Sequence, residues 1–92
     1  MELYQLKCFL AAANCENFSR AAEEVHISQS SISKVIGRLE EELGVRLVER
    51  DNRFIALTKA GAVLREEAEH LLSAASAAAA RVKAVGEKNA EA

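Results

Sequence analysis

A long stretch with almost no helix-breaking residue constrains this fold most. The segment KAGAVLREEAEHLLSAASAAAARVKAV begins at Lys59, lacks proline and has almost no breaker after Gly61. If it runs to about residue 89, it forms a helix about 45 Å long at about 1.5 Å per residue. The whole chain has 92 residues, enough for one small domain. We therefore expect this helix to extend beyond the core, with residues 90–92 frayed.

The same stretch carries an apolar heptad pattern. Apolar residues recur every seven positions from Leu64 to Val85, and a companion series runs from Ala68 to Val82. Such a seam is typical of paired helices. It could dock on its own domain or pair with a second copy, and its length favours self-association, with the leucines burying most of the apolar area. The candidate dimerisation residues are Leu64, Ala68, Leu71, Leu72, Ala75, Ala78 and Val82.

Three shorter helices are predicted before residue 45. Apolar residues at helical spacing predict the first over 3–13, followed by a polar connection over 14–17. Ser19 is the predicted N-cap of a short second helix, and Ser28 that of a third helix ending at Gly44. The apolar stripe predicted for the third helix comprises Ile32, Val35, Ile36, Leu39 and Leu43.

A change of period follows Gly44. Leu47 and Val48, then residues 54–57, indicate two short strands joined by a turn at Asp51-Asn52. Thr58 can cap the long helix. The predicted fold class is mainly α, a helix-turn-helix at about 18–37 with a wing at about 46–57, so that the domain covers 1–58 and the linker helix 59–89.

Several functional classes are disfavoured. No stretch is apolar for long enough to span a bilayer, and the first residues lack the order of a signal peptide, so we expect a cytoplasmic protein. Cys8 and Cys15 form no zinc-ligand spacing with His26 and His70, and we interpret them as core or surface thiols, with redox sensing as the alternative. No phosphate loop, metal spacing or nucleophile–base pair is evident, so we expect neither an enzyme nor a cofactor.

The charge distribution is informative only locally. The net charge of −2 disfavours a simple binder of polyanions. Between His26 and Arg38, however, there are two bases and no acid, while acids concentrate at 40–42 and 66–69. A chain whose net charge is close to zero can therefore still have a basic surface on one side.

The polar side of the third helix carries the chemistry. Small hydroxyl groups, a glycine and two cations point away from the apolar stripe, and Gln29 lies at its edge. The DNA major groove admits a helix, glutamine can pair with adenine, and lysine or arginine can reach guanine or phosphate. In the alternative interpretation the serines only start a helix and the glutamates after Leu39 form its solvated face.

A family resemblance is carried by three sequence segments, FSRAAEEVHISQSSIS, IGRLEEELGVRLVER and LTKAG. With these segments in this order, the chain resembles the N-terminal DNA-binding domain of LysR-type transcriptional regulators over nearly its whole length. The resemblance implies a winged helix-turn-helix, a linker helix that pairs two subunits, dimers on double-stranded DNA, and often tetramers of the complete protein. Family members also carry a C-terminal effector-binding domain for a small molecule. We expect this chain, which has none, to be a fragment, with a naturally short form as the alternative.

The resemblance also implies site residues. The family's recognition helix maps onto residues 29–34, its wing contacts onto Arg50 and Arg53, and a phosphate contact onto Arg20. The sequence departs from the family where serines replace proline or alanine at 30–31, and at Gly37 and Val48. The full set of candidate DNA-binding residues is Arg20, Ser28, Gln29, Ser30, Ser31, Ser33, Lys34, Arg38, Arg50 and Arg53.

The expected function is sequence-specific DNA binding by a homodimer that reads an inverted-repeat operator. The alternative is a helical protein-interaction module that pairs through the long helix and does not bind DNA. The local charge split and the predicted wing favour DNA binding.

Overall fold

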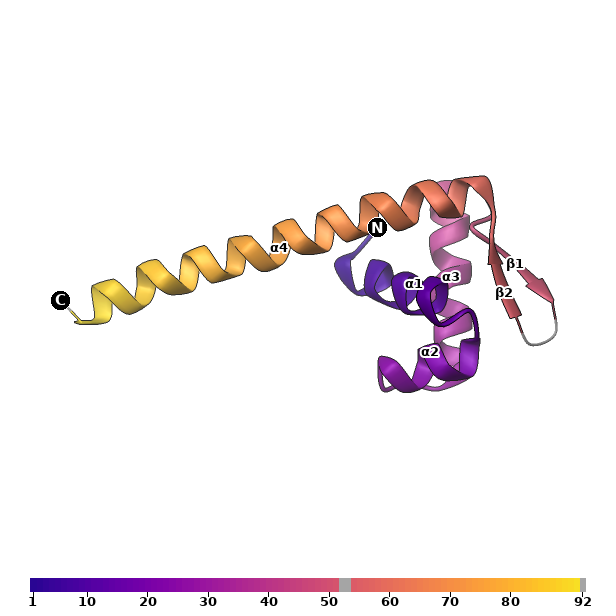
Figure 1. The fold of residues 1–92 in the computed structure, drawn as a ribbon, viewed down its shortest axis with the longest axis horizontal. Coiled ribbons are helices and arrows are strands. Elements are labelled where there is room, and N and C mark those ends of the chain that lie inside the picture. Colours follow the sequence, from indigo (N-terminus) through magenta and orange to yellow (C-terminus); the bar gives the residue numbers. More distant parts are fainter. Residues whose placement is uncertain (52–53, 92) are drawn as a thin grey trace.

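The computed structural model describes residues 1–51 and 54–91. Its elements are α1 (Leu3–Cys15), α2 (Phe18–Glu24), α3 (Gln29–Leu43), β1 (Val48–Asp51), β2 (Phe54–Leu57) and α4 (Lys59–Glu91). Helices α1–α3 gather beside the first part of α4, the hairpin lies at one end, and the rest of α4 projects away (Figure 1). The predicted class, a mainly helical winged helix-turn-helix followed by a long helix, is confirmed.

The core lies around α1, which packs against all three other helices and β2. Phe9 and Leu6 of α1 are fully buried, as are Ile32, Ile36 and Leu39 of α3. The stripe predicted for α3 is therefore confirmed in the middle of the helix. Its last member is not, because Leu43 is 41% exposed. Periodicity places Leu43 on the stripe but does not say where the neighbouring elements end, and Leu43 lies beyond the buried middle of the helix.

The helix boundaries are set by side-chain caps and left-handed residues. Ser28 caps α3 as predicted, accepting the Ser31 N–H at 3.1 Å. The prediction of Ser19 as the α2 cap is wrong, because Asn17 Oδ1 accepts the Arg20 N–H at 3.2 Å and α2 begins at Phe18. Asparagine is as good a cap as serine, so two candidates two residues apart compete on equal terms.

The helix ends are equally well defined. Helix α1 continues to Cys15, beyond the predicted start of the polar connection, and ends at Glu16, whose φ is 55°. Helix α3 ends at Gly44, whose φ of 71° suits glycine, as the sequence predicts. Helix α4 reaches Glu91 rather than residue 89. No glycine or proline follows Gly86 to stop it earlier.

The hairpin is antiparallel, with Val48 opposite Leu57 and Asp51 opposite Phe54. The predicted turn lies partly outside the described residues, which omit Asn52. The Ile55 N–H donates to the Glu16 carbonyl at 3.1 Å, which ties the hairpin to the α1–α2 connection. The wing is thus anchored to the helical core.

The start of α4 is held closely against the segment that leads into β1. Thr58 caps the helix as predicted, accepting the Gly61 N–H at 3.0 Å, and its hydroxyl donates to the Arg46 carbonyl at 2.6 Å. Gly61 is buried, and a β-carbon there would overlap the Leu47 carbonyl oxygen. Only glycine therefore permits this approach.

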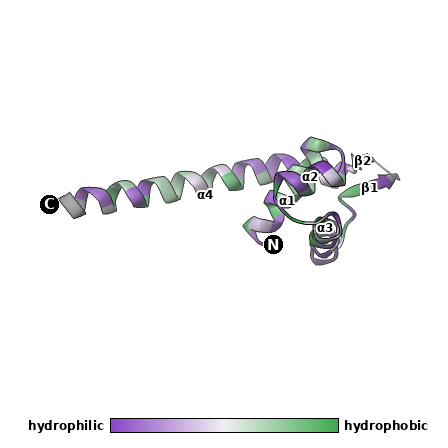
Figure 2. Cartoon of the chain, turned by 90° about the horizontal axis from the view of Figure 1, so that it is seen from below, coloured by the Kyte–Doolittle hydropathy of each residue, from purple (hydrophilic) through white to green (hydrophobic). Residues whose placement is uncertain are grey.

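Beyond its first turns α4 leaves the domain. Leu64 and Ala68 belong to the core, whereas the residues from Ser76 to Lys88 are all exposed. The molecule is accordingly elongated, with extents of 57 × 24 × 19 Å. Apolar segments continue along the projecting part of α4 (Figure 2). Within residues 1–51 and 54–91, no helix combines the length and apolar character needed to cross a membrane.

Candidate nucleic-acid interface

The outer face of α3 is polar and accessible. Gln29, Ser30, Lys34 and Arg38 are exposed, and Ser33 is half-buried. This orientation agrees with the predicted division between the apolar stripe and the polar side. Neither Lys34 nor Arg38 forms an ion pair within residues 1–51 and 54–91. The two cations are therefore available to an anion outside the chain.

The serines at the start of α3 bond to one another. Ser28 Oγ donates to Ser31 Oγ at 2.8 Å and accepts the Ser31 N–H, and it lies 3.2 Å from Ser30 Oγ. Ser28 and Ser31 therefore stabilise the helix start first of all, although both remain exposed. Of the three, Ser30 is the least engaged.

A shallow depression lies where α2 meets the start of α3. Its lining consists of Phe18, Gln29, Ser30 and Ser33. The Ser19 hydroxyl donates to Gln29 Oε1 at 2.9 Å. Sequence analysis assigned Ser19 only to a cap. The bond crosses from one helix to the next and has no signature in the sequence.

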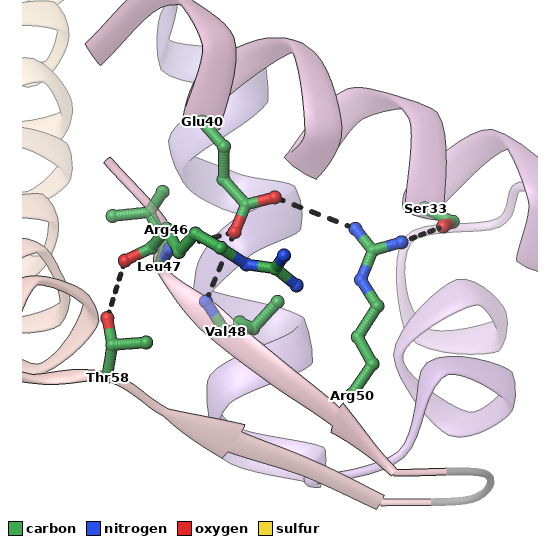
Figure 3. Close-up of polar contacts among 7 residues, drawn as sticks. All are labelled: Ser33, Glu40, Arg46, Leu47, Val48, Arg50 and Thr58. Carbon is green, nitrogen blue, oxygen red and sulfur yellow. Dashed lines mark hydrogen bonds and ion pairs between the residues drawn. The ribbon is translucent and has the colours of Figure 1, made fainter. Parts of the chain in front are cut away.

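Arg50 of β1 reaches across to α3 (Figure 3). Its Nη1 donates to Ser33 Oγ at 3.1 Å, and its Nη2 lies 3.8 Å from Glu40 Oε1. The guanidinium carbon lies 5.3 Å from the Phe18 ring centroid, within range of a cation–π contact. Arg50, predicted to contact DNA from the wing, is thus bound to the recognition surface of its own chain.

Glu40 is a structural residue. Its Oε2 accepts the backbone N–H groups of Leu47 at 2.8 Å and Val48 at 3.3 Å, so it holds the start of β1 against α3 (Figure 3). Its side chain is only 15% exposed. The interpretation of residues 40–42 as a uniformly solvated acidic face is therefore wrong at Glu40. Sequence analysis missed this role, because the bonds span the end of α3 and depend on how the chain turns there.

One predicted arginine, Arg20, is not brought to this surface, and a second lies outside the described residues. Arg20 is exposed on α2, where it lines a separate depression with Asn14, Cys15, Glu23 and Glu24. Arg53 lies outside the described residues, and its contact stays a prediction.

The thiols have environments that disfavour reactivity. Cys8 is fully buried, and burial raises the pKa of its thiol. Burial also raises the pKa of the Cys15 thiol, and the hydrogen bond to Glu24, 3.2 Å from Sγ, adds to the increase. Since the thiolate is the reactive form, these shifts favour structural thiols over redox sensing. No group of metal-ligating side chains occurs in the part of the chain that the structure describes.

The predicted dimer seam divides into two parts. Leu64 and Ala68 are buried in the domain's own core, and Leu72 is half-buried against it. Leu71 is 42% exposed and Val82 is 72% exposed, Ala78 is also exposed, and Ala75 is half-buried. The part that starts at Leu71 is thus accessible to a second copy.

Comparison with protein families gives one match over most of the chain. The family model described as a bacterial regulatory helix-turn-helix protein, lysR family, matches residues 3–62. The HTH-type transcriptional activator IlvY of Salmonella typhimurium is 47% identical over 72 residues, which cover 78% of this chain and 24% of that protein. The Hca operon transcriptional activator HcaR of Escherichia coli is 44% identical over 85 residues, which cover 92% of this chain and 29% of that protein. The chain spans about a quarter of the length of these curated relatives.

Two similar solved structures contain DNA. In the CbnR_DBD–DNA complex, the protein is 41% identical and superposes with a TM-score of 0.90, covering 94% of this chain and 99% of that one. In the BenM_DBD/catB site 1 DNA complex, the identity is 35% and the TM-score 0.90, covering 94% of this chain and 97% of that one.

Proposed function

Because this chain belongs to the lysR family of bacterial regulatory helix-turn-helix proteins, we propose that it binds double-stranded DNA sequence-specifically, as a homodimer. The observation that carries the proposal is the outer face of α3, where the donors of Gln29, Ser30 and Lys34 stand exposed beside a buried apolar stripe. A helix with this division can enter a major groove without uncovering its core. The DNA complexes of CbnR and BenM support this docking.

The proposed contacts divide by chemistry. Gln29, Ser30 and Ser33 read base edges, and Ser28 and Ser31 support them at the helix start. Lys34 and Arg38 lie one helical turn apart as like charges, a placement that costs an isolated helix about 0.2–0.5 kcal/mol. A phosphate or guanine between them would remove this repulsion. Arg20 and Arg53 are proposed as backbone contacts at the two edges of the interface.

The proposed dimer forms through the exposed part of α4. One module touches few base pairs, whereas two modules related by a two-fold axis read an inverted repeat, with half-sites about one helical turn or a multiple apart. Leu64, Leu71 and Ala78 lie seven apart on one side of α4, and that side is covered at Leu64 and open at Leu71. A second helix laid along Leu71, Ala75, Ala78 and Val82 would continue the burial that the core begins.

In cellular terms the proposal describes the DNA-binding part of a transcription regulator without enzymatic activity. Because its proposed target is chromosomal DNA, we propose that it acts in the bacterial cytoplasm. A small-molecule effector would act through a region outside these 92 residues. Tetramers would likewise require contacts beyond α4.

The first test is selection from random duplexes by the purified protein, read by sequencing. Recovery of an inverted repeat would support base readout by a dimer. A salt titration then counts phosphate contacts, since the logarithm of the binding constant falls with a slope of about −0.9 per neutralised phosphate. A flat salt response and no recovered sequence would leave a protein-interaction module as the function.

Replacing Gln29 by alanine tests the reading surface. Gln29→Ala should weaken binding to the selected site by about 1–3 kcal/mol and leave non-specific binding unchanged, because base contacts carry the discrimination and phosphate contacts carry the rest. Titration of both duplexes by fluorescence anisotropy measures the difference. Equal losses on both would remove Gln29 from base readout.

A further inference from the structure

Two hydrogen bonds reach the outer face of α3 from other elements. Ser19 of α2 donates to Oε1 of Gln29 at 2.9 Å. Arg50 of β1 donates to Oγ of Ser33 at 3.1 Å. In both, the side chain on α3 is the acceptor and its partner comes from a neighbouring element.

These bonds determine what the two side chains can offer to DNA. An amide whose oxygen is turned towards α2 directs its NH₂ group elsewhere, and a hydroxyl whose oxygen accepts from a guanidinium keeps its single proton to donate. Both residues line the depression beside Phe18 and Ser30. Gln29 and Ser33 therefore present hydrogen-bond donors at one place on the surface.

We propose that Ser19 and Arg50 are positioning residues that set the base preference of α3, by orienting Gln29 and Ser33 as donors. The matching acceptors in the major groove are N7 and O6 of guanine, N7 of adenine and O4 of thymine. The inference rests on the proposed function, because it assumes that α3 reads bases. It assigns Arg50 a role different from the backbone or minor-groove contact that the family resemblance implies for the wing.

Arg50 is well held for this role. Glu40 lies 3.8 Å from one end of the guanidinium and Phe18 lies beneath it. Glu40 is itself fixed by the N–H groups of Leu47 and Val48. The planar fork of arginine can engage Glu40 and Ser33 at the same time, which the single ammonium of lysine does less well.

The Arg50 arm is tested by repeating the selection from random duplexes with Arg50→Met and Arg50→Lys. Methionine keeps an apolar stem and removes the donors, while lysine keeps the charge. Both should change the recovered sequence at the position that Ser33→Ala changes, and weaken binding to the wild-type site about three- to tenfold. Adding Arg50→Met to Ser33→Ala should cause little further loss, because the two share one interaction.

Matched substitutions separate this role from a general charge effect. Arg46 is exposed on the same segment and forms no side-chain bond to α3 among the described residues. Arg46→Met should leave the recovered sequence unchanged. For the Ser19 arm, Ser19→Ala should alter the position that Gln29→Ala alters, and Ser19→Thr, which keeps a hydroxyl, should restore it.

Four results would overturn the inference in whole or in part. Arg50 is a phosphate ligand if Arg50→Met weakens binding to all duplexes equally and reduces the salt slope by about one contact, and if Arg50→Lys restores binding. If Ser19→Ala selects the same sequence as the wild-type protein, Ser19 does not set the base preference of α3. A wild-type protein that selects a sequence which none of these variants alters would overturn the inference alone, whereas a wild-type protein that selects nothing would overturn the proposed function with it. Circular dichroism confirms that each variant is folded.

Discussion

Helices α3 and α4 both carry an apolar stripe, which α3 buries within the chain for most of its length and α4 buries only near its start. Ile32, Ile36 and Leu39 of α3 are fully buried, and the opposite face is left for polar contacts. In α4 the stripe is buried at Leu64 and Ala68 and then continues past the edge of the domain. The contrast teaches that an apolar pattern identifies a packing face without identifying its partner. For α3 the partner is the core, and for α4 beyond Leu71 we propose a second copy.

The largest expected difference comes from the same truncation in the two stripes. Leu39→Ala should lower the free energy of unfolding by about 2–5 kcal/mol, because a fully buried side chain leaves a cavity. Leu71→Ala should lower it by less than about 1 kcal/mol in the dilute monomer, since Leu71 is 42% exposed. Urea unfolding followed by circular dichroism measures both. Equal losses would break the distinction between the two helices.

The contact between α4 and the segment before β1 can be broken at one glycine. A β-carbon at Gly61 would overlap the Leu47 carbonyl oxygen, a backbone atom that cannot move alone. Gly61→Ala should therefore lower the free energy of unfolding by about 3 kcal/mol, near the upper end for overpacking. A thermal melt measures the loss. An unchanged melting temperature would mean that α4 can shift away from Leu47 without loss of stability.

A negative charge introduced on the exposed part of α4 tests whether this part forms the dimer interface. Leu71→Asp should weaken dimerisation by about 2 kcal/mol, because a carboxylate would replace an apolar contact in both copies. Sedimentation equilibrium measures the dimer constant. Ser73→Asp is the matched control, since Ser73 lies about 200° around the helix from Leu71 at 3.6 residues per turn. An intact Leu71→Asp dimer would place the interface elsewhere.

The smallest expected effect is a gain in stability at Gly37. A β-carbon there meets no atom within 4 Å. Gly37→Ala should raise the free energy of unfolding by about 1 kcal/mol, because glycine is the poorer helix former. Measured beside Gly61→Ala, the same substitution has opposite signs in the two helices. If DNA affinity falls while stability rises, the space at Gly37 serves close approach of the backbone to DNA.

The sequence predicted what depends on local spacing. Ser28 and Thr58 as caps, Gly44 as a helix stop and the hairpin after residue 46 were all recognisable, because each involves residues within a few positions. The helical periodicity placed Lys34 on the polar face of α3 and Gln29 at its edge, and the resemblance assigned both to the DNA interface. Their DNA contacts remain predictions.

What the sequence could not predict depends on which elements meet. The choice of Asn17 over Ser19 as a cap is a competition between two equal candidates, which the sequence alone does not rank. The Glu40 bonds to Leu47 and Val48 require the turn after Gly44 to be known. To predict that the α4 seam divides at Leu71, one must know where the core of the domain ends. Each of these depends on distances between segments, for which periodicity gives no information.

The attachment of α4 at Gly61 has a mechanical consequence. At about 1.5 Å per residue the 33-residue helix is about 50 Å long, so tilting it by about 5° at its base moves the far end by about 4 Å. That displacement is close to the rise of one base pair, about 3.4 Å. In the dimer that we propose, α4 would act as a lever. The contacts at its base, which are Gly61 against the Leu47 carbonyl and Leu64 and Ala68 in the core, would limit how accurately the two copies keep their spacing along a duplex.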